Sequence, residues 1–156
     1  MNFIENGERK MRIDREEYYA NILEAVRKRS TCDRGESGAI IVKDNRLITT
    51  GYVGAPRGRP HCDEKGHFMV HNHCIRTVHA ELNAILQAAR FGISIEGGTM
   101  YCTMTPCYEC AKAIVNVGLV KVIATYPYPY GVADLSIQLF RDSNIEFKLL
   151  NETFLY

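Results

Sequence analysis

The chain has 156 residues, of which 46% are hydrophobic and 24% charged, and its 19 basic and 18 acidic side chains leave a formal net charge of +1. This length and composition suit one globular domain over residues 1–156, and the near-neutral charge gives no basic footprint of the kind that binds a nucleic-acid polymer. Apolar runs stay below the roughly 18 residues of a membrane span, and the charged N-terminus lacks a secretory apolar segment, so we expect a cytoplasmic protein without a membrane partner.

The first predicted element is a helix from Asp14 to about Ser30. Asp14 and Glu17 have the spacing of a capping box, in which unpaired amides at the start of a helix find side-chain acceptors. Apolar residues then recur at the helical period and predict an inward face made of Tyr18, Ile22, Leu23 and Val26.

A β-hairpin and a long loop are predicted next. The apolar runs 38–43 and 46–53 flank Asp44-Asn45, which is a typical hairpin turn. Residues 54–76 are rich in Gly, Pro and His, and we expect a loop insertion over about 55–76. A loop of that length in a compact domain is usually functional or held by a cross-link.

Helices and strands alternate over the rest of the chain. Residues 78–92 predict a helix capped by Gly92, with an inward face of Leu82, Ile85, Leu86 and Ala89. Pro106 is predicted at the first position of a second helix that closes at Gly118. Strands are predicted at 97–104, 119–126 and 145–150, with a helix at 134–142. This alternation predicts an α/β fold in which a mixed sheet carries helices on its faces.

The cysteines and histidines are clustered along the chain. Disulfides suit a secreted protein, whereas grouped Cys and His in a chain without a secretion signal are typical of metal ligands. Four of the five histidines lie between residues 60 and 74, together with two cysteines. The full set of cysteines is Cys32, Cys62, Cys74, Cys102, Cys107 and Cys110. Of these, Cys102 lies within a predicted strand and is expected to pack as a small apolar side chain.

The strongest chemical signal combines His79-x-Glu81 with Cys107-x-x-Cys110. Each motif opens a predicted helix, and cysteines three residues apart on a helix can reach one ion. A CxxC alone could be a redox pair, and an HxE alone is more often a surface helix start. Together and in this order, with a Pro before the first cysteine, they are the signature of zinc-dependent nucleobase deaminases. One His and two Cys leave zinc a fourth position for water, as in catalytic sites.

The segments "TVHAELNAILQAARFG", "MTPCYECAKAIVNVG" and "TTGYVGAPRG" resemble the deoxycytidylate (dCMP) deaminase family, over most of residues 14 to 150. The resemblance implies a three-layer α/β/α cytidine-deaminase-like fold with a five-stranded mixed sheet. It implies that His79, Cys107 and Cys110 hold a catalytic zinc ion. It also implies that Glu81 moves protons while dCMP is hydrolysed to dUMP, the precursor of dTMP, and ammonia.

Substrate contacts are expected at the end of the hairpin and in an aromatic loop. Gly54, Arg57 and Arg59 lie in a segment that family members carry beside the sugar and phosphate, although the composition fits a solvated turn equally well. Val53 stands where the family usually has Asn, and Val cannot hydrogen-bond a sugar hydroxyl. Tyr128 and Tyr130 follow a strand end and are further candidates, against the alternative of a Pro-stiffened loop.

A second, structural zinc ion is the expected function of the histidine-rich stretch, as in some family members. It would hold the loop insertion in place, whereas the alternative is a set of exposed histidines and free thiols. His71 or His73 could replace the histidine of the preferred set. That set is Cys32, Cys62, His67 and Cys74.

The family resemblance also implies a homo-hexamer that dCTP activates and dTTP inhibits, often with Mg²⁺. Arg90 is a candidate effector contact, although an Arg on a helix is usually just solvated. Two alternatives to a dCMP deaminase follow from the same motifs. One is another zinc deaminase, acting on tRNA adenosine or free cytidine, and the near-neutral charge weighs against a tRNA enzyme. The other is a non-catalytic nucleotide-binding protein of the same fold, for which Glu81 would have no use.

Overall fold

The computed structural model describes residues 4–5, 8–9, 11–128, 131 and 133–152. Its centre is a five-stranded sheet. The two strands of the predicted hairpin, 38–43 and 46–52, pair antiparallel with each other, and strand 38–43 also pairs antiparallel with strand 99–104. The last two pairings are parallel, so the sheet is mixed as predicted. In spatial order the strands are β4 (Arg46–Tyr52), β3 (Gly38–Lys43), β7 (Thr99–Met104), β8 (Lys121–Tyr126) and β9 (Glu146–Leu149).

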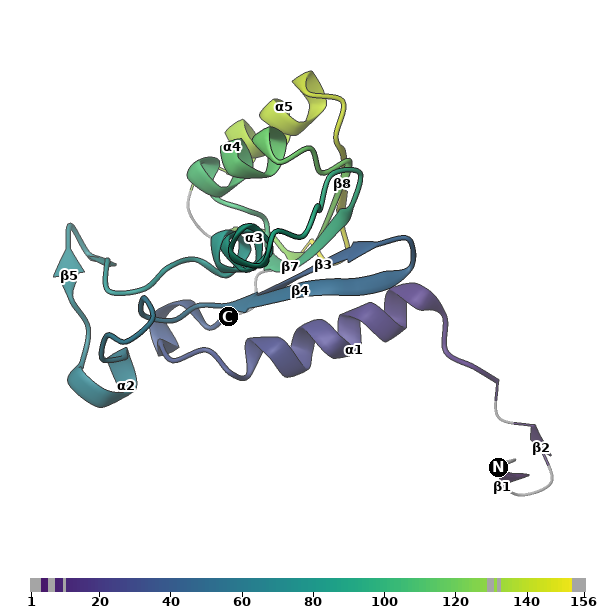
Figure 1. Ribbon diagram of the computed structural model, residues 1–156, viewed down its shortest axis with the longest axis horizontal. Helices are drawn as coiled ribbons and strands as arrows, with labels where there is room; N and C mark the ends of the chain where they lie inside the picture. Colours follow the sequence, from purple (N-terminus) through teal and green to yellow (C-terminus); the bar gives the residue numbers. More distant parts are fainter. Residues whose placement is uncertain (1–3, 6–7, 10, 129–130, 132, 153–156) are drawn as a thin grey trace.

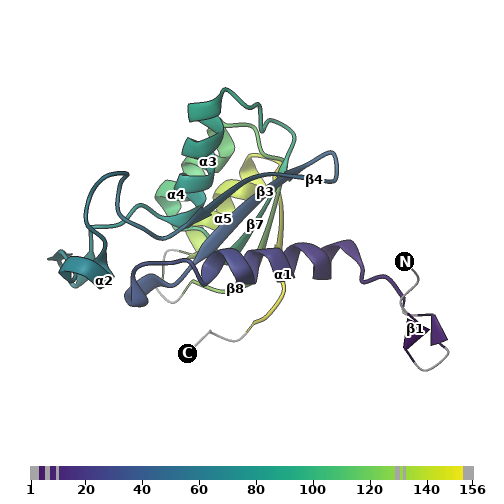
Figure 2. The ribbon, with the colours of Figure 1, turned by 60° about the horizontal axis from the view of Figure 1, so that its bottom comes forward.

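Helices cover both faces of this sheet and make three layers (Figure 1; Figure 2). Helix α1 (Arg15–Arg27) lies along one face. The other face carries α3 (Ala80–Phe91), α4 (Tyr108–Asn116) and α5 (Ala133–Asp142). This arrangement confirms the predicted α/β/α fold with a five-stranded mixed sheet. Among the helices that the structure describes, none is both long and apolar enough to cross a bilayer.

The two faces of β3 explain why the sheet is buried on both sides. Successive side chains of a strand point to opposite faces. Ile40 and Val42 pack in the cluster beneath α1, whereas Ala39 and Ile41 pack in the larger cluster beneath α3 and α4. The nearly continuous apolar run "GAIIV" is therefore what a central strand between two helical layers requires.

Helix α1 begins as predicted, but its inward face is rotated by one residue at its start. The Glu17 amide donates a 2.8 Å hydrogen bond to the Asp14 carboxylate, so Asp14 is the N-cap. The prediction that Tyr18 faces inward is wrong, because its side chain is 49% exposed. Tyr19 is buried instead, with its ring 5.3 Å from that of Tyr101 on β7. The two adjacent tyrosines are equivalent in periodicity, and the strand-borne partner decides between them.

Helix α3 also differs in phase from its prediction. Leu86 and Ala89 are exposed rather than inward-facing. The helix lies close against β4, and a Cβ added at Gly51 would overlap the carbonyl oxygen of Ala80. Small residues permit this close approach, so the inward stripe is mostly alanine. It consists of Ala80, Glu81, Ala84, Ile85 and Ala88.

The hairpin and the insertion are both ordered. Asp44 and Asn45 both have positive φ, at 50° and 58°, as a two-residue type I′ turn requires. The predicted 55–76 loop contains short elements of its own and projects from one end of the layers (Figure 1). They are α2 (Cys62–Lys65), β5 (Met69–Val70) and β6 (His73–Cys74). Strands β1 (Ile4–Glu5) and β2 (Glu8–Arg9) pair in a separate two-stranded sheet, and η1 (Asp33–Gly35) is a single 3₁₀ turn before β3.

Candidate active site

Three potential metal ligands meet where two helices begin. His79 is the N-cap of α3, and Cys107 is the N-cap of α4, with Cys110 in the first turn of that helix. The Nδ1 atom of His79 lies 3.4 Å from Sγ of Cys107 and 3.6 Å from Sγ of Cys110. Pro106 was predicted as the first helical residue, which is wrong by two positions because Cys107 caps the helix. The helix ends as predicted, with Gly118 at a φ of 74°.

These distances fit zinc. Zn–S bonds of about 2.3 Å and Zn–N bonds of about 2.05 Å at a tetrahedral angle place S and N roughly 3.6 Å apart. The observed separations of 3.4 and 3.6 Å match that value. His79, Cys107 and Cys110 therefore form a donor set of catalytic type, in which the fourth position is left to a small molecule.

The pKa values of the two cysteine thiols in this cluster are shifted in opposite directions. A hydrogen bond from the Cys110 thiol lowers the pKa of Cys107 to about 4, and His79 adds to the effect. The same bond, together with burial, raises the pKa of Cys110. The hydrogen bond with Cys107 raises the pKa of His79. Cys107 is thus the thiol of this cluster that ionises more readily, and it lies at the start of α4, where the helix dipole also favours negative charge.

Glu81 is a buried carboxyl group beside this cluster. Its residue is only 6% exposed, and burial raises its pKa, although the nearby His79 opposes the shift. A carboxyl group whose pKa is moved toward neutrality can both accept and release a proton during turnover. Glu81 is the second residue of α3, so the helix that carries His79 also aims this carboxyl group.

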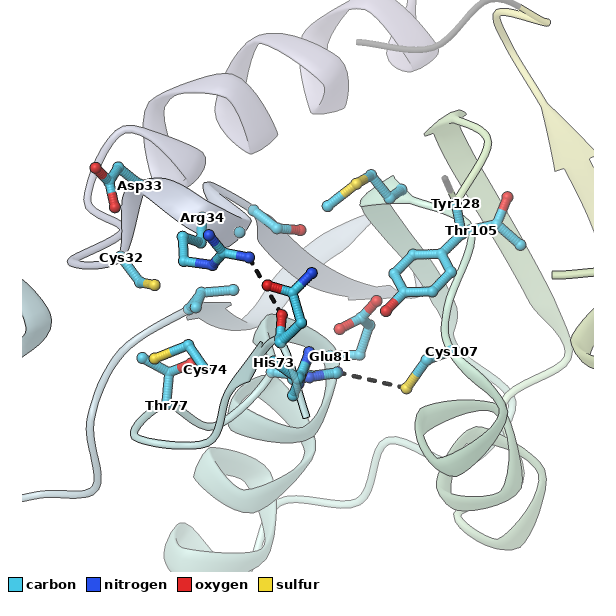
Figure 3. Close-up of a pocket in the computed structure, with 16 residues that line it drawn as sticks. Cys32, Asp33, Arg34, His73, Cys74, Thr77, Glu81, Thr105, Cys107 and Tyr128 are labelled. Carbon is cyan, nitrogen blue, oxygen red and sulfur yellow. Dashed lines mark hydrogen bonds between the residues drawn. The ribbon is translucent and has the colours of Figure 1, made fainter. Parts of the chain in front are cut away.

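A pocket of about 330 Å³ opens over the cluster and Glu81. Figure 3 shows Glu81, Cys107 and Tyr128 on one side of it and Arg34 and Cys32 on the other. This volume is within the range of small-molecule sites, which begins at roughly 300 Å³. Besides His79, Glu81 and Cys107, the pocket is lined by residues 32–35, Ser37, Val53, residues 72–74, Thr77, Met104, Thr105 and Tyr128.

Only some of the residues predicted to contact the substrate line the pocket. Tyr128 lines the pocket, whereas Tyr130 lies outside the described residues. Arg57 and Arg59 are exposed in a turn and do not line it. Gly54 does not line it either, because its backbone pairs with Val78 in an isolated β-bridge. The hairpin end therefore reaches the pocket through Val53, the residue just before Gly54.

Sequence reasoning missed several polar residues that line the pocket, among them Arg34, Ser37, Asn72 and Thr105. Arg34 and Asn72 lie in segments whose position depends on the second Cys/His cluster. The signal that could have indicated Arg34 is its place two residues after Cys32.

The second cluster joins the end of α1 to the insertion. One ligand atom from each of four residues lies within 4.8 Å of all the others. The Cys62 and Cys74 sulfurs are 3.7 Å apart, and Cys32 Sγ is 3.7 Å from Nδ1 of His67. Two thiolates on one tetrahedral zinc ion are roughly 3.8 Å apart, so this set fits zinc as well. The group is the sequence-preferred one, Cys32, Cys62, His67 and Cys74.

The two alternate histidines lie elsewhere. His71 and Asn72 have φ values of 46° and 61° and form the turn between β5 and β6. His73 places its ring edge-on to His79, with 5.9 Å between the ring centroids, and lines the pocket. The hairpin thus points His73 toward the first cluster while the next residue, Cys74, belongs to the second.

Neighbouring groups orient the ligands of the second cluster. Nε2 of His67 is 3.1 Å from the Asp33 carboxylate, which fixes Nδ1 toward the thiols. A carboxylate behind a metal-binding histidine is a common outer partner in zinc sites. Burial raises the pKa of Cys74, but hydrogen bonds from the backbone amides of Arg76 and Phe68, together with those of the His67 and Cys62 side chains, lower it to about 7. Cys74 is therefore the thiol of this group that ionises most readily.

Comparison with known proteins agrees with this geometry. Residues 13–126 match the family model described as the cytidine and deoxycytidylate deaminase zinc-binding region. The chain belongs to this family. The match includes both Cys/His clusters and the β3–β4 hairpin.

Several known proteins are similar to this chain along much of their length. ComE operon protein 2 of Bacillus subtilis is 38% identical over 134 residues, covering 86% of this chain and 70% of that protein. The deoxycytidylate deaminase of Enterobacteria phage T4 is 36% identical over 141 residues, covering 66% of this chain and 73% of the phage protein. The dCMP deaminase of cyanophage S-TIM5, solved with dCMP and dUMP, superposes with a TM-score of 0.77 at 28% identity, covering 90% and 99% of the two chains.

Two remaining expectations concern residues away from the pocket. Arg90 lies at the exposed end of α3 with its guanidinium 5.5 Å from the centroid of the Phe91 ring, and its role as an effector contact stays a prediction. Cys102 is fully buried in β7 within the larger core cluster. It packs there as expected from the sequence.

Proposed function

We propose that this family member is a zinc-dependent dCMP deaminase, which hydrolyses dCMP to dUMP and ammonia. The observation that carries the proposal is the meeting of His79, Cys107 and Cys110 at the floor of a nucleotide-sized pocket, with a buried carboxyl group beside them. The similarity to a dCMP deaminase solved with its substrate and product supports the choice of dCMP.

The residues divide the reaction between them. Zinc held by His79, Cys107 and Cys110 would supply Lewis-acid activation of water near neutral pH. Glu81 accepts the proton that the attacking water loses and delivers it to N3 of the cytosine. It then carries the second proton to the 4-amino nitrogen, which leaves as ammonia while C4 keeps the oxygen. Water and dCMP are thereby converted to dUMP and ammonia with protons balanced.

Burial matters to each of these steps. Glu81 lies inside the inward stripe of α3, so a proton on its carboxyl group is held rather than lost to bulk water. Val53 and Met104 supply apolar wall beside the polar groups of the pocket. Excluding water in this way strengthens the charge interactions that orient the reacting groups.

The second cluster is proposed to hold a structural zinc ion. Its four donors fill a tetrahedral site, which leaves no position for substrate. The cluster connects the end of α1 with α2 and β6, and it would hold the 55–76 insertion against the rest of a single domain.

Further features are proposed from family resemblance. They are a homo-hexamer, activation by dCTP and inhibition by dTTP with Mg²⁺, an effector contact at Arg90, and a cytoplasmic location. The exposed Leu86, Phe91 and Ile93 at the end of α3 are compatible with a subunit contact there.

The decisive experiment measures ammonia release from dCMP, dCTP, deoxycytidine and CMP, each with and without dCTP or dTTP as effector. We expect dCMP to be the preferred substrate. Preference for free deoxycytidine would overturn the substrate assignment, and tight nucleotide binding without any ammonia release would favour a non-catalytic nucleotide-binding protein. Release of ammonia from tRNA rather than from mononucleotides would favour a tRNA adenosine deaminase.

A further inference from the structure

The second Cys/His cluster is bordered by two cavities. Cys32 and Cys74 line the substrate pocket, and Figure 3 shows both sulfur atoms at one side of it. Another cavity, of about 300 Å³, is lined by Cys32, Cys62 and His67, and neither Glu81 nor the ligands of the first cluster line it. The three thiols of the second cluster are at most 7% exposed, so these cavities are the routes by which a small molecule reaches them.

Two thiols of this cluster are placed to join. The sulfur atoms of Cys62 and Cys74 lie 3.7 Å apart. A disulfide bond is about 2.04 Å long, so these atoms must approach by roughly 1.7 Å, which rotation about side-chain bonds supplies. Cys62 begins α2, and Cys74 lies in β6, which belongs to a separate two-stranded sheet. The pair can therefore close without moving a strand of the central sheet.

Zinc binding would keep these thiols in their reactive form. A thiol that coordinates zinc is deprotonated, and the thiolate is the form that attacks an oxidant. Hydrogen peroxide is a small neutral oxidant for which a cavity of about 300 Å³ has ample room. A peroxide is therefore the class of molecule that fits both the access route and the chemistry of the cluster.

We propose that Cys62 and Cys74 form a modification site, at which a peroxide joins their sulfur atoms in a disulfide bond and releases the zinc ion. The inference rests on the structural zinc ion of the proposed function. One thiolate attacks the peroxide, so that an S–O bond forms, the O–O bond breaks and hydroxide leaves. The other thiolate attacks that sulfur, an S–S bond forms, and a second hydroxide leaves. The two sulfurs together lose two electrons, which the peroxide gains.

The disulfide would change what the cluster holds together. Cys62 and Cys74 both lie in the insertion, so their bond does not replace the link that a shared zinc ion makes to Cys32 at the end of α1. Residues 32–35 and 72–74 line the substrate pocket. They are joined by a 3.2 Å hydrogen bond from Arg34 Nη2 to the backbone carbonyl of Asn72 (Figure 3). Releasing Cys32 from the cluster therefore loosens this wall of the pocket.

Oxidation of the first cluster makes a different prediction. A disulfide between Cys107 and Cys110 would also stop turnover, but it would release the zinc ion of the first cluster and leave the second cluster intact. The ligands of the first cluster lie at helices that pack on the central sheet, whereas Cys62 and Cys74 lie in short elements. Locating the disulfide by peptide mapping separates the two cases.

The test uses the zinc-loaded 156-residue protein and two variants. Cys62→His supplies a different zinc ligand at that position and removes one partner of the disulfide. Cys102→Ala is the matched control, because Cys102 is a buried thiol that belongs to neither cluster. Each protein is treated with hydrogen peroxide. The measurements are zinc release to a chromogenic chelator, disulfide mapping by mass spectrometry without reduction, and kcat/KM for dCMP.

We expect the wild type and Cys102→Ala to release about one zinc ion per chain while the peptides of Cys62 and Cys74 become linked. Their kcat/KM for dCMP should fall by at least about 10-fold, because a displaced pocket wall misplaces the substrate, and dithiothreitol with added zinc should restore it. Cys62→His should release zinc at least about 10-fold more slowly.

Three results would overturn the proposal. They are retention of both zinc ions by the treated wild type, a disulfide mapped to Cys107 and Cys110 instead, and equally fast release from Cys62→His. If Cys62→His does not bind a second zinc ion, the mapping of the wild type decides.

The measurements keep this proposal separate from the proposed function. One zinc ion in the untreated protein contradicts the structural site, while the mapping still decides whether peroxide links Cys62 to Cys74. A protein that releases no ammonia from dCMP contradicts the proposed activity, and zinc release and mapping are measured without turnover.

Discussion

The two Cys/His clusters use the same ligand chemistry in opposite surroundings. The first has three donors, sits at the N-termini of α3 and α4, and faces a pocket with a buried carboxyl group beside it. The second has four donors drawn from loops and short elements, and its histidine is backed by a carboxylate. Ligand count and neighbours, rather than the abundance of Cys and His, distinguish a reactive site from a structural one.

The clusters also differ in what holds their ligands. His79 and Cys107 are fixed by helices that pack on the sheet, so their positions follow from the core. His67 and Cys74 lie in an insertion whose strands are two residues long. The first site is therefore built by the fold, whereas we propose that the second, with zinc bound, helps to hold the insertion in place.

The largest expected effect on activity comes from a substitution in the first site. Glu81→Gln should lower kcat for dCMP by at least about 10²- to 10⁴-fold, because the carboxyl group that moves both protons is gone. Zinc bound at His79, Cys107 and Cys110 should stay, as measured by metal analysis and ammonia release. The matched control is Glu109→Gln, since Glu109 is exposed on α4 and pairs with Lys112. Substantial turnover by Glu81→Gln would contradict its role.

Breaking the second site should affect stability rather than chemistry. We expect about two zinc ions per wild-type chain and about one in Cys62→Ser, with the free energy of unfolding lowered by about 3 kcal/mol or more. Metal analysis and denaturant unfolding measure both quantities. His71→Asn is the control, because Asn tolerates the positive φ of that turn and His71 lies outside the cluster. One zinc ion in the wild type, with normal folding of Cys62→Ser, would remove the structural site.

A smaller effect is expected from a substitution beside the second cluster that keeps all four ligands in place. Asp33→Asn removes the negative charge that orients His67 and should weaken zinc binding at the second cluster by about 10- to 100-fold. Competition with a chelator measures that affinity, while retention of the catalytic zinc ion provides an internal reference. Asp63→Asn, at an exposed position of α2, is the matched variant. Equal affinities for both variants would show that Asp33 does not support the site.

Much of the fold and the first site could be predicted because their signals are local. The Asp14 cap, the Asp44-Asn45 turn and Gly118 each act on their immediate neighbours, and the structure contains all of them. The spacing between Cys107 and Cys110 likewise places both thiols on one turn. Such features need little knowledge of the rest of the molecule.

The features that were missed depend on contacts between distant segments. Leu86 fits the helical period, but α3 turns its alanine stripe to β4 because the strand carries Gly51 there. Arg34 lines the pocket only because residues 32–34 and 72–74 are brought together across 38 residues of sequence. A hydrophobic or motif pattern read along one segment carries no information about either event.

The close approach of Gly51 to Ala80 has a consequence for how this scaffold can diversify. The strand fixes the start of α3 and with it His79 and Glu81, whereas another wall of the pocket comes from residues 32–35 and 72–74, beside the second Cys/His cluster. The proposed catalytic groups and this wall therefore lie in different stretches of the chain. We therefore expect that residues of this wall can be exchanged to admit a new ligand with little effect on the groups at the start of α3.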